Sequence, residues 1–359
     1  MEYKVKDCVK STIYDNLKEI ATSNISWEKL RNKTLLLTGA GGFIGYYMTL
    51  GILLRNDLFG DNIKMIALER NGDVIRSRFG KLCERDDIEL VIQNVDEPIK
   101  ASRADFVIHA ASQASNIEFE NDPVGTINAN LMGTANVLDY AKECGSEASL
   151  IISSLKVYGQ VFNGKGYVTE EDNGYIDFTS YKNCYAMGKR ASETLAASYA
   201  KEFGMSIKIA RPSYIYGASS LTDDRVWAQF IANIVKKESI LLKSNGATNR
   251  SFCYVTDTVT AMLYILLDGA DVTPYNIAYD KSNTTIRGFA KTACEVFPER
   301  NMTLSFANPE DEKEPQVDTS PLAQTPEILD SSRLRAIGWE PKVDLKEGIR
   351  RAVAILEEN

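Results

Sequence analysis

The chain has 359 residues, of which 44% are hydrophobic and 25% charged, an ordinary composition for a globular protein with a sizeable core. This length allows one large α/β domain or two smaller ones. The net charge of −8 argues against a general binder of nucleic acid or of anionic membranes. No stretch approaches the roughly 18 uncharged apolar residues that a membrane span needs, and the first residues lack the apolar core of a signal peptide.

The cysteines and the single histidine narrow the chemistry further. The six cysteines are scattered and contain no C-x-x-C pair, which predicts reduced thiols in a cytoplasmic protein rather than disulfides or a zinc site. The histidine, His109, is expected at the end of a buried strand. One histidine argues against histidine-based metal centres and catalytic triads, so we expect no metal ion.

Residues 1–32 are polar, with apolar side chains at helical spacing around Ile13, Leu17 and Ile20. This pattern predicts a helical extension packed on the outside of the molecule. We assign it no chemistry.

A glycine-rich turn is the most informative stretch of the chain. It follows an apolar strand at residues 35–37 and precedes an apolar helix at 46–54. A strand that turns tightly into a helix leaves unpaired N–H groups and the positive end of the helix dipole at one spot, which suits a diphosphate. The spacing is G-x-x-G-x-x-G, carried by Gly39, Gly42 and Gly45, and these glycines would let phosphate oxygens approach the backbone.

The next strand, residues 63–68, ends in Glu69. An acidic residue at this place can accept hydrogen bonds from the hydroxyls of an adenosine ribose, and it would repel the 2′-phosphate of NADP. Arg70 and Arg76 follow closely, so the sequence disfavours NADP without excluding it. The expected cofactor is NAD.

Further strands alternate with helices, which predicts an α/β fold with a Rossmann-type, doubly wound parallel sheet. Small or polar residues follow these strands, where a cofactor can approach. The strands are expected at 89–93, 105–109 and 149–153, with an amphipathic helix at 126–144. The residues beside them are Asn94, Val95, Ala110, Ala111, Ser112 and, on the helix, Asn130.

Tyr185 and Lys189 form a second constellation, at the start of a helix that runs to about residue 203. The i, i+4 spacing places the phenol and the ammonium on one helix face. A nearby cation favours the phenolate, so this tyrosine can act as a base below its ordinary pKa. Ser154 follows the strand at 149–153 and supplies a hydroxyl.

In this order, these residues resemble the extended short-chain dehydrogenase/reductase family, specifically its nucleotide-sugar epimerases, dehydratases and decarboxylases. The resemblance runs from about residue 33 to the C-terminus. It rests on residues 38–45 (TGAGGFIG), 109–111 (HAA), 130–134 (NLMGT), 153–159 (SSLKVYG), Tyr185 with Lys189, 211–217 (RPSYIYG), 249–257 (NRSFCYVTD) and 337–341 (IGWEP).

The resemblance implies a role for each matching residue. Tyr185 would take a proton from a sugar hydroxyl while hydride passes from the same carbon to NAD⁺. Lys189 would bind the nicotinamide ribose and hold the tyrosine pKa down, and Ser154 would hydrogen-bond the reacting oxygen. The expected NAD contacts are Gly39, Gly42, Phe43, Ile44, Gly45, Glu69, Asn94, Val95, Ala110, Ala111, Ser112, Asn130, Tyr185 and Lys189.

The resemblance also implies substrate contacts. Arg250 matches an arginine that grips the substrate diphosphate, which suits the bidentate geometry of guanidinium. Arg225 is a second candidate for the same task. Tyr214 stands where many members have an asparagine that contacts the substrate.

The catalytic loop departs from the dehydratases and decarboxylases. These subgroups commonly carry Asp-Glu or Ser-Glu at the positions of Leu155 and Lys156, and leucine cannot transfer a proton. Lysine at the second position occurs in some dehydratases and resembles CDP-tyvelose epimerases. Lys156 has three readings at this stage: a catalytic acid/base, a substrate contact or a solvated side chain.

Other segments, 184–194 and 221–226, resemble the UDP-glucuronate decarboxylases. The arginine that this family carries before its Gly-Trp-Glu-Pro segment has no clear counterpart in residues 307–329. Because Ser154, Tyr185 and Lys189 are present and the acidic pair is missing, we predict an NAD-dependent nucleotide-sugar epimerase acting through a transient keto-sugar. The alternatives are a decarboxylase of the UDP-glucuronate type, a 4,6-dehydratase, or a protein that binds NAD and a nucleotide sugar without catalysis.

The same resemblance predicts the domain organisation. After the extension at 1–32, an NAD-binding domain would span 33–212. A smaller C-terminal α/β substrate domain would span 213–359, with the chain returning to the sheet near 252–278. The helices at 126–144 and 183–203 resemble those that pair across the family's homodimer as a four-helix bundle.

Overall fold

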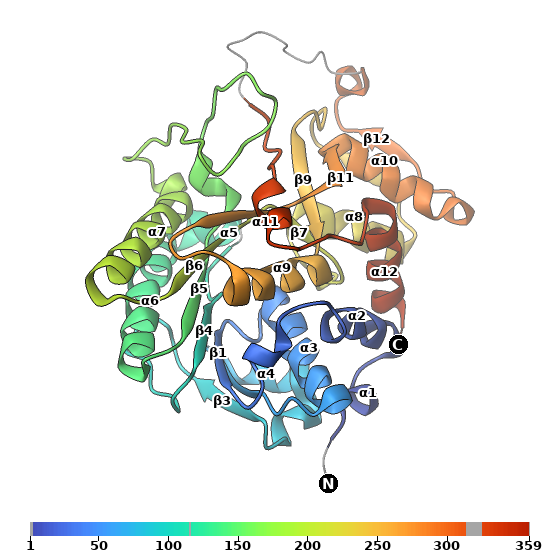
Figure 1. Cartoon of the computed structure of the whole chain (residues 1–359). Coiled ribbons are helices and arrows are strands. Elements are labelled where there is room, and N and C mark those ends of the chain that lie inside the picture. The colour runs from blue at the N-terminus through green and yellow to red at the C-terminus, as the bar shows by residue number, and fades with distance from the viewer. Residues whose placement is uncertain (1–2, 115, 314–324, 359) are drawn as a thin grey trace.

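A parallel sheet organises the protein, whose computed structural model describes residues 3–114, 116–313 and 325–358 (Figure 1). In the described chain this sheet has seven strands in the order β10-β6-β5-β4-β1-β2-β3, and every neighbouring pair is parallel. The predicted α/β fold with a Rossmann-type sheet is therefore confirmed. The strands are β1 (Thr34–Thr38), β2 (Lys64–Glu69), β3 (Ile88–Ile92), β4 (Phe106–His109), β5 (Ala148–Ile152), β6 (Ile207–Pro212) and β10 (Pro274–Ile277).

Helices cover both faces of this sheet, which is why its central strands are apolar along their whole length. Leu35 and Leu37 of β1 join the core formed with α3 (Phe43–Phe59) and α9 (Val255–Asp268). Leu36, between them, joins the opposite core beside Val137 of α6. On that face α6 (Pro123–Cys144) packs against α7 (Cys184–Phe203).

The N-terminal stretch forms α1 (Val5–Cys8) and α2 (Ser11–Ala21), which lie over α3 beside the C-terminal helix α12 (Leu345–Glu357) (Figure 1). Leu17 and Ile20 have no exposed surface and belong to the largest hydrophobic core. Gly51 of α3 leaves room for this contact, because a Cβ at that position would stand 2.6 Å from the Ile20 side chain. The extension is thus continuous with the core.

A smaller group of elements follows β6. It contains a three-stranded sheet in the order β11-β9-β7 and the parallel pair β12-β8. The chain returns to the main sheet through α9 and β10, within residues 252–278. The elements are β7 (Tyr214–Tyr216), β8 (Ile240–Leu242), β9 (Asn249–Tyr254), β11 (Tyr279–Thr285), β12 (Leu304–Phe306), α8 (Val226–Lys236), α10 (Ile286–Val296) and α11 (Ser332–Ala336).

The strand order reverses between β1 and β4, and ligands of open α/β sheets bind at the carboxyl ends of the strands beside such a reversal. The glycine turn after β1, residues 110–112 after β4 and Ser154 after β5 all lie at this edge. Two shorter helices complete the main-sheet half, α4 (Gly72–Phe79) and α5 (Asn116–Asn121). Among the described residues, no helix combines the length and apolarity needed to cross a bilayer.

Replacing Ile20 by alanine tests whether the extension belongs to the core. Since the side chain is fully buried, we expect Ile20→Ala to lower the free energy of unfolding by about 2–5 kcal/mol. Lys18→Ala, at an exposed position of the same helix, should change it by less than about 0.5 kcal/mol. Urea unfolding measures both values, and equal effects of the two substitutions would contradict the packing of α2.

Candidate active site

The glycine turn brings the backbone of β1 against that of β4. Gly39 has a φ of +71°, and a Cβ there would stand 2.9 Å from the Cα of Ala111. A Cβ at Gly45 would stand 2.2 Å from the carbonyl oxygen of Gly39. The N-cap of α3 is Gly42, which has no side chain that could cap the first turn. Phe43, Ile44 and Gly45 therefore present N–H groups and the positive end of a long helix, which fits the diphosphate of a dinucleotide.

Glu69 lies beside this turn, at the end of β2. Its Oε2 accepts a hydrogen bond from the N–H of Gly41 at 3.1 Å. Asn94 lines an open pocket with Arg70 and Arg76 on the same side of the sheet. Arg70 forms an ion pair with Glu118 at 3.5 Å. The carboxylate of Glu69 is thus nearest to the turn, as binding of a ribose hydroxyl requires.

The segment after β4 is held close to β1 by hydrogen bonds. The N–H groups of Ala110 and Ala111 both donate to the hydroxyl of Thr38 at 3.1 Å. Ser112 donates to the side-chain oxygen of Asn130 at 2.8 Å, and Asn130 is fully buried. The backbone after β4 is thereby fixed beside the glycine turn.

Val95 and His109 complete this wall. The side chain of Val95 packs against Gly133 of α6, where a Cβ would stand only 3.0 Å from it. Burial lowers the pKa of His109 to about 3, so the imidazole is neutral. Its Nδ1 lies 2.9 Å from the hydroxyl of Thr38. His109 therefore has a structural place at the end of β4.

Tyr185, Ser154 and Lys189 meet at the carboxyl ends of β5 and β6. Burial raises the pKa of Tyr185, while a hydrogen bond with Ser154 and the positive charge of Lys156 lower it. Lys189 lies with its Nζ 5.8 Å from the centre of the tyrosine ring and donates to the carbonyl oxygen of Ile152 at 2.7 Å. Burial lowers the pKa of Lys189 to about 7. Burial has the largest effect on Tyr185, so its pKa lies above its ordinary value.

A second polar group, which we call the Lys156 cluster, contains Lys156, Tyr214, Arg250 and Glu327. The Nζ of Lys156 donates to Glu327 at 2.5 Å and to the hydroxyl of Tyr214 at 2.8 Å. Tyr214 donates to the other carboxylate oxygen of Glu327 at 2.6 Å. Arg250 lies 3.5 Å from that oxygen and stacks 4.4 Å from the centre of the Tyr214 ring. Lys156 is thus ion-paired rather than merely solvated.

The Lys156 cluster borders a cavity of about 270 Å³. Ala186, which follows Tyr185 in α7, and Asn183 line the same cavity as Lys156 and Glu327. The cavity is therefore next to the Tyr185 group. A sugar placed here would meet Lys156 and Glu327.

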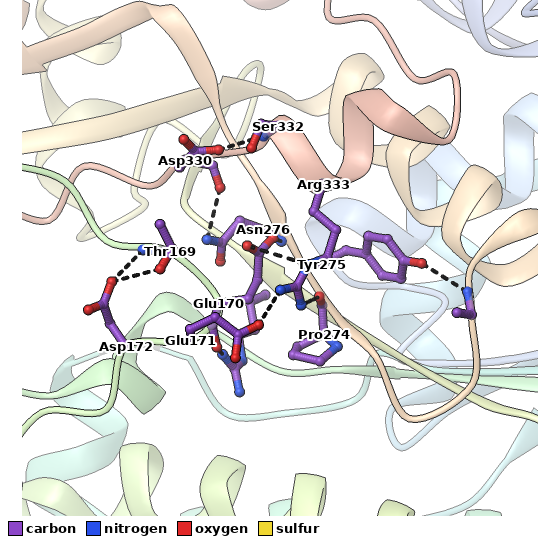
Figure 2. A network of polar contacts seen from close by, with 12 residues as sticks. Thr169, Glu170, Glu171, Asp172, Pro274, Tyr275, Asn276, Asp330, Ser332 and Arg333 are labelled. Carbon is purple, nitrogen blue, oxygen red and sulfur yellow. Dashed lines mark hydrogen bonds and ion pairs between the residues drawn. The ribbon is translucent and has the colours of Figure 1, made fainter.

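The segment that carries Glu327 is fixed on two sides. Ser251 of β9 donates to the carbonyl oxygen of Glu327 at 3.0 Å, and Val168 donates to the next carbonyl, of Ile328, at 2.7 Å. Figure 2 shows the contacts that follow, where Asn276 donates to the carbonyl oxygen of Asp330 at 3.0 Å. Arg333 donates to the carbonyl of Pro274 at 3.1 Å and forms an ion pair with Glu171.

The two candidate diphosphate arginines have different partners. Arg225 forms an ion pair with Asp223 and lies over the rings of Phe43 and Trp227, beside the start of α3. Arg250 belongs to the Lys156 cluster, and its buried Nε has no hydrogen-bond acceptor among the described residues. This Nε faces the carboxylate of Glu327 at 3.5 Å.

Glu327 is the functional candidate that the sequence did not provide. It lies 171 positions from its partner Lys156, and no motif relates the two. Glu327 lies within residues 307–329, where the family's C-terminal arginine has no counterpart. A carboxylate there, opposite the lysine of the catalytic loop, was the signal that could have identified it.

Comparisons with known proteins identify the family of the chain. Residues 35–278 match the model of the "NAD dependent epimerase/dehydratase family". UDP-glucuronic acid decarboxylase 6 of Arabidopsis thaliana is 32% identical over 320 residues, which cover 89% of this chain and 87% of that protein.

Solved structures of two other enzymes share the fold. UDP-glucose 4-epimerase of Thermotoga maritima aligns with a TM-score of 0.71 at 21% identity, over 90% of this chain and 98% of that one. dTDP-glucose 4,6-dehydratase of Bacillus anthracis, solved with NAD, aligns with a TM-score of 0.72 at 17% identity, over 91% and 97%.

The buried Lys189 makes stability depend on pH. Its pKa is about 7 in the folded protein and about 10.4 in an unfolded chain. Between these values the unfolded state binds the extra proton, so the free energy of unfolding should rise with pH from about 7 to 10 and fall toward pH 7. Lys189→Met should remove this part of the slope, as measured by urea unfolding of NAD-free protein. An unchanged slope would contradict a neutral, buried Lys189.

Proposed function

Because the chain belongs to the NAD dependent epimerase/dehydratase family, we propose that it is an NAD-dependent nucleotide-sugar epimerase acting through a transient keto-sugar. The group includes epimerases, dehydratases and decarboxylases of nucleotide sugars, and its cofactor is NAD. The observation that carries the proposal is the meeting of Tyr185 with Ser154 beside Lys189, in a catalytic loop without the usual acidic pair.

Each residue has a task in such a reaction. NAD⁺, when bound, supplies a reversible hydride acceptor. Tyr185 accepts the proton of the sugar hydroxyl, and Ser154 hydrogen-bonds the same oxygen and so keeps it in place. Glu69 would bind the adenosine ribose of NAD, and the N-terminus of α3 would bind its diphosphate. Arg250 offers its guanidinium to the substrate diphosphate.

A decarboxylase is the second candidate, favoured by the identity of 32% to UDP-glucuronic acid decarboxylase 6. A 4-keto-uronate has its carboxylate on the carbon next to the ketone, which makes loss of carbon dioxide chemically easy. Lys156 and Arg250 could then bind the carboxylate. Leu155 argues against it, since it cannot replace the hydroxyl or carboxyl group usual at its position.

Mass spectrometry of products separates these reactions. The protein would be incubated with NAD⁺ and a panel of UDP-, dTDP-, CDP- and GDP-sugars that includes UDP-glucuronate. A product of unchanged mass and different chromatographic retention supports epimerisation. Loss of carbon dioxide or of water would overturn the proposal in favour of a decarboxylase or a dehydratase.

Tyr185→Phe tests the role of the base. We expect it to lower turnover by about 10²–10⁴-fold, because it removes the group that accepts the hydroxyl proton, while NAD and substrate still bind by calorimetry. Tyr181→Phe is the matched control, since Tyr181 is 50% exposed and bonds only to Glu120 among the described residues. Wild-type protein that binds both ligands yet forms no reduced nicotinamide in a single turnover would instead be a binding protein.

The paired helices α6 and α7 support a proposed homodimer through a four-helix bundle. They expose Met132 and Phe203, which are 48% and 45% accessible. We expect a dimer by light scattering at micromolar concentration, and Met132→Glu should shift it toward monomer because it places a charge in an apolar contact. A wild-type monomer would contradict this arrangement.

A further inference from the structure

Inversion at the oxidised carbon itself gives Glu327 no task, and it uses Lys156 only as a positive charge that lowers the pKa of Tyr185. That reaction requires only removal and return of hydride and of the hydroxyl proton, which Tyr185 and Ser154 serve. Yet Lys156 and Glu327 both line the cavity beside Tyr185. Their side chains remain 42% and 27% exposed, so both can reach a ligand.

The geometry of the pair suits proton transfer. Lys156 and Glu327 are joined at 2.5 Å, and Tyr214 hydrogen-bonds both. Since the backbone of Glu327 is bonded to β9 on one side and the next carbonyl to Val168 on the other, the carboxylate is held in place before a substrate arrives. The contacts in Figure 2 anchor the rest of the segment to β10.

Lys156 and Glu327 carry opposite charges, and each shifts the pKa of the other so that the charged form is favoured. Burial alone would lower the pKa of Lys156, but Tyr214 and Glu327 raise it above its ordinary value. Burial alone would raise the pKa of Glu327, but Lys156, Tyr214 and Arg250 lower it. At neutral pH the site therefore contains an ammonium acid and a carboxylate base within one hydrogen bond of each other.

We propose that Glu327 and Lys156 are the base and the acid that exchange a proton at the carbon next to the keto carbon of the sugar. This inference rests on the proposed function, which generates the ketone. A ketone acidifies the C–H bonds of its neighbouring carbons, so a positioned carboxylate can remove such a proton. The substrates would be nucleotide sugars that react beside the oxidised carbon.

The step balances within the cluster. The C–H bond breaks, its proton passes to the carboxylate of Glu327, and its electron pair forms the enolate, whose oxygen faces Tyr185 and Ser154. Lys156 then gives a proton to the same carbon and the enolate returns to the ketone. The proton on Glu327 moves to the Lys156 amine along their hydrogen bond, which restores both groups.

Deuterium uptake from solvent tests this proposal. The full chain would be incubated in D₂O with NAD⁺ and, separately, with UDP-glucose, UDP-glucuronate, dTDP-glucose, CDP-glucose and GDP-mannose. Mass spectrometry would measure carbon-bound deuterium in recovered substrate and product, and absorbance would follow reduced nicotinamide in a single turnover. We expect one carbon-bound deuterium in any sugar that is oxidised.

Glu327→Gln should lower deuterium uptake by about 10²-fold or more, while reduced nicotinamide still forms. Lys156→Met should lower deuterium uptake more than it slows formation of reduced nicotinamide, which it slows because it removes a charge that lowers the pKa of Tyr185. Glu310→Gln and Lys182→Met are the matched controls at exposed positions, and they should leave both readouts unchanged. Circular dichroism would verify that all four variants fold.

The outcomes separate this inference from the proposed function. Wild-type protein that oxidises a sugar without taking up deuterium overturns the inference and leaves the function standing. Variants that lose oxidation and uptake in equal measure would show that the cluster only shapes the site, which also overturns it. Absence of reduced nicotinamide and of product with every sugar overturns the function and the inference together.

Discussion

The buried ion pair between Arg211 and Glu193 determines where the two halves of the site stand. Arg211, at the end of β6, donates to Glu193 of α7 through Nε at 2.9 Å and through Nη2 at 2.6 Å. Its Nη1 donates to the hydroxyl of Tyr158 and to the carbonyl oxygen of Glu170, both at 3.1 Å. A buried guanidinium is tolerated only where its N–H groups have hydrogen-bond acceptors. Those of Arg211 donate to three different segments, which contain Glu193, Tyr158 and Glu170.

The consequence is a chain of contacts that reaches the C-terminal segment. Tyr158 donates to the side-chain oxygen of Asn276 at 2.6 Å, and the N–H of Asn276 donates to Glu170 at 2.8 Å. Asn276 also holds the carbonyl of Asp330, three positions after Glu327 (Figure 2). Hydrogen bonds thus connect both α7, which carries Tyr185, and the segment that carries Glu327 to the buried guanidinium of Arg211. Burial makes this network costly to leave half-satisfied, so it acts as one unit.

The features that the sequence predicted are local ones. The glycine turn needs only a strand, a tight turn and a helix, and its glycines are dictated by contacts such as that of Gly39 with Ala111. Tyr185 and Lys189 are one helical turn apart, so their proximity follows from spacing alone. The parallel, doubly wound sheet followed from the alternation of apolar runs with helices. Each of these rests on short-range geometry that a sequence displays directly.

The residues of the Lys156 cluster are far apart in the sequence, and this is why the sequence did not predict the role of Lys156. Lys156 and Glu327 are 171 positions apart, and Tyr214 and Glu327 are 113 apart. Their meeting depends on the return of the chain to β10 and on the buried contacts of Asn276, which leave no periodic trace. The sequence gives Lys156 three readings, and the ion pair with Glu327 removes the solvated one.

Two lysines, Lys189 and Lys156, lie near Tyr185, whereas the sequence predicted an effect of Lys189 alone on its pKa. Lys189 is buried without a carboxylate in hydrogen-bonding contact among the described residues, so its pKa falls to about 7 and its positive charge is only partial at neutral pH. Lys156 keeps its charge because Glu327 and Tyr214 accept hydrogen bonds from its ammonium group. The charge of Lys156 therefore lowers the pKa of Tyr185 against the larger effect of burial, and loss of a proton from Lys156 would remove this effect. Oxidation at one carbon and proton exchange at its neighbour would then be coupled through the charge of one side chain.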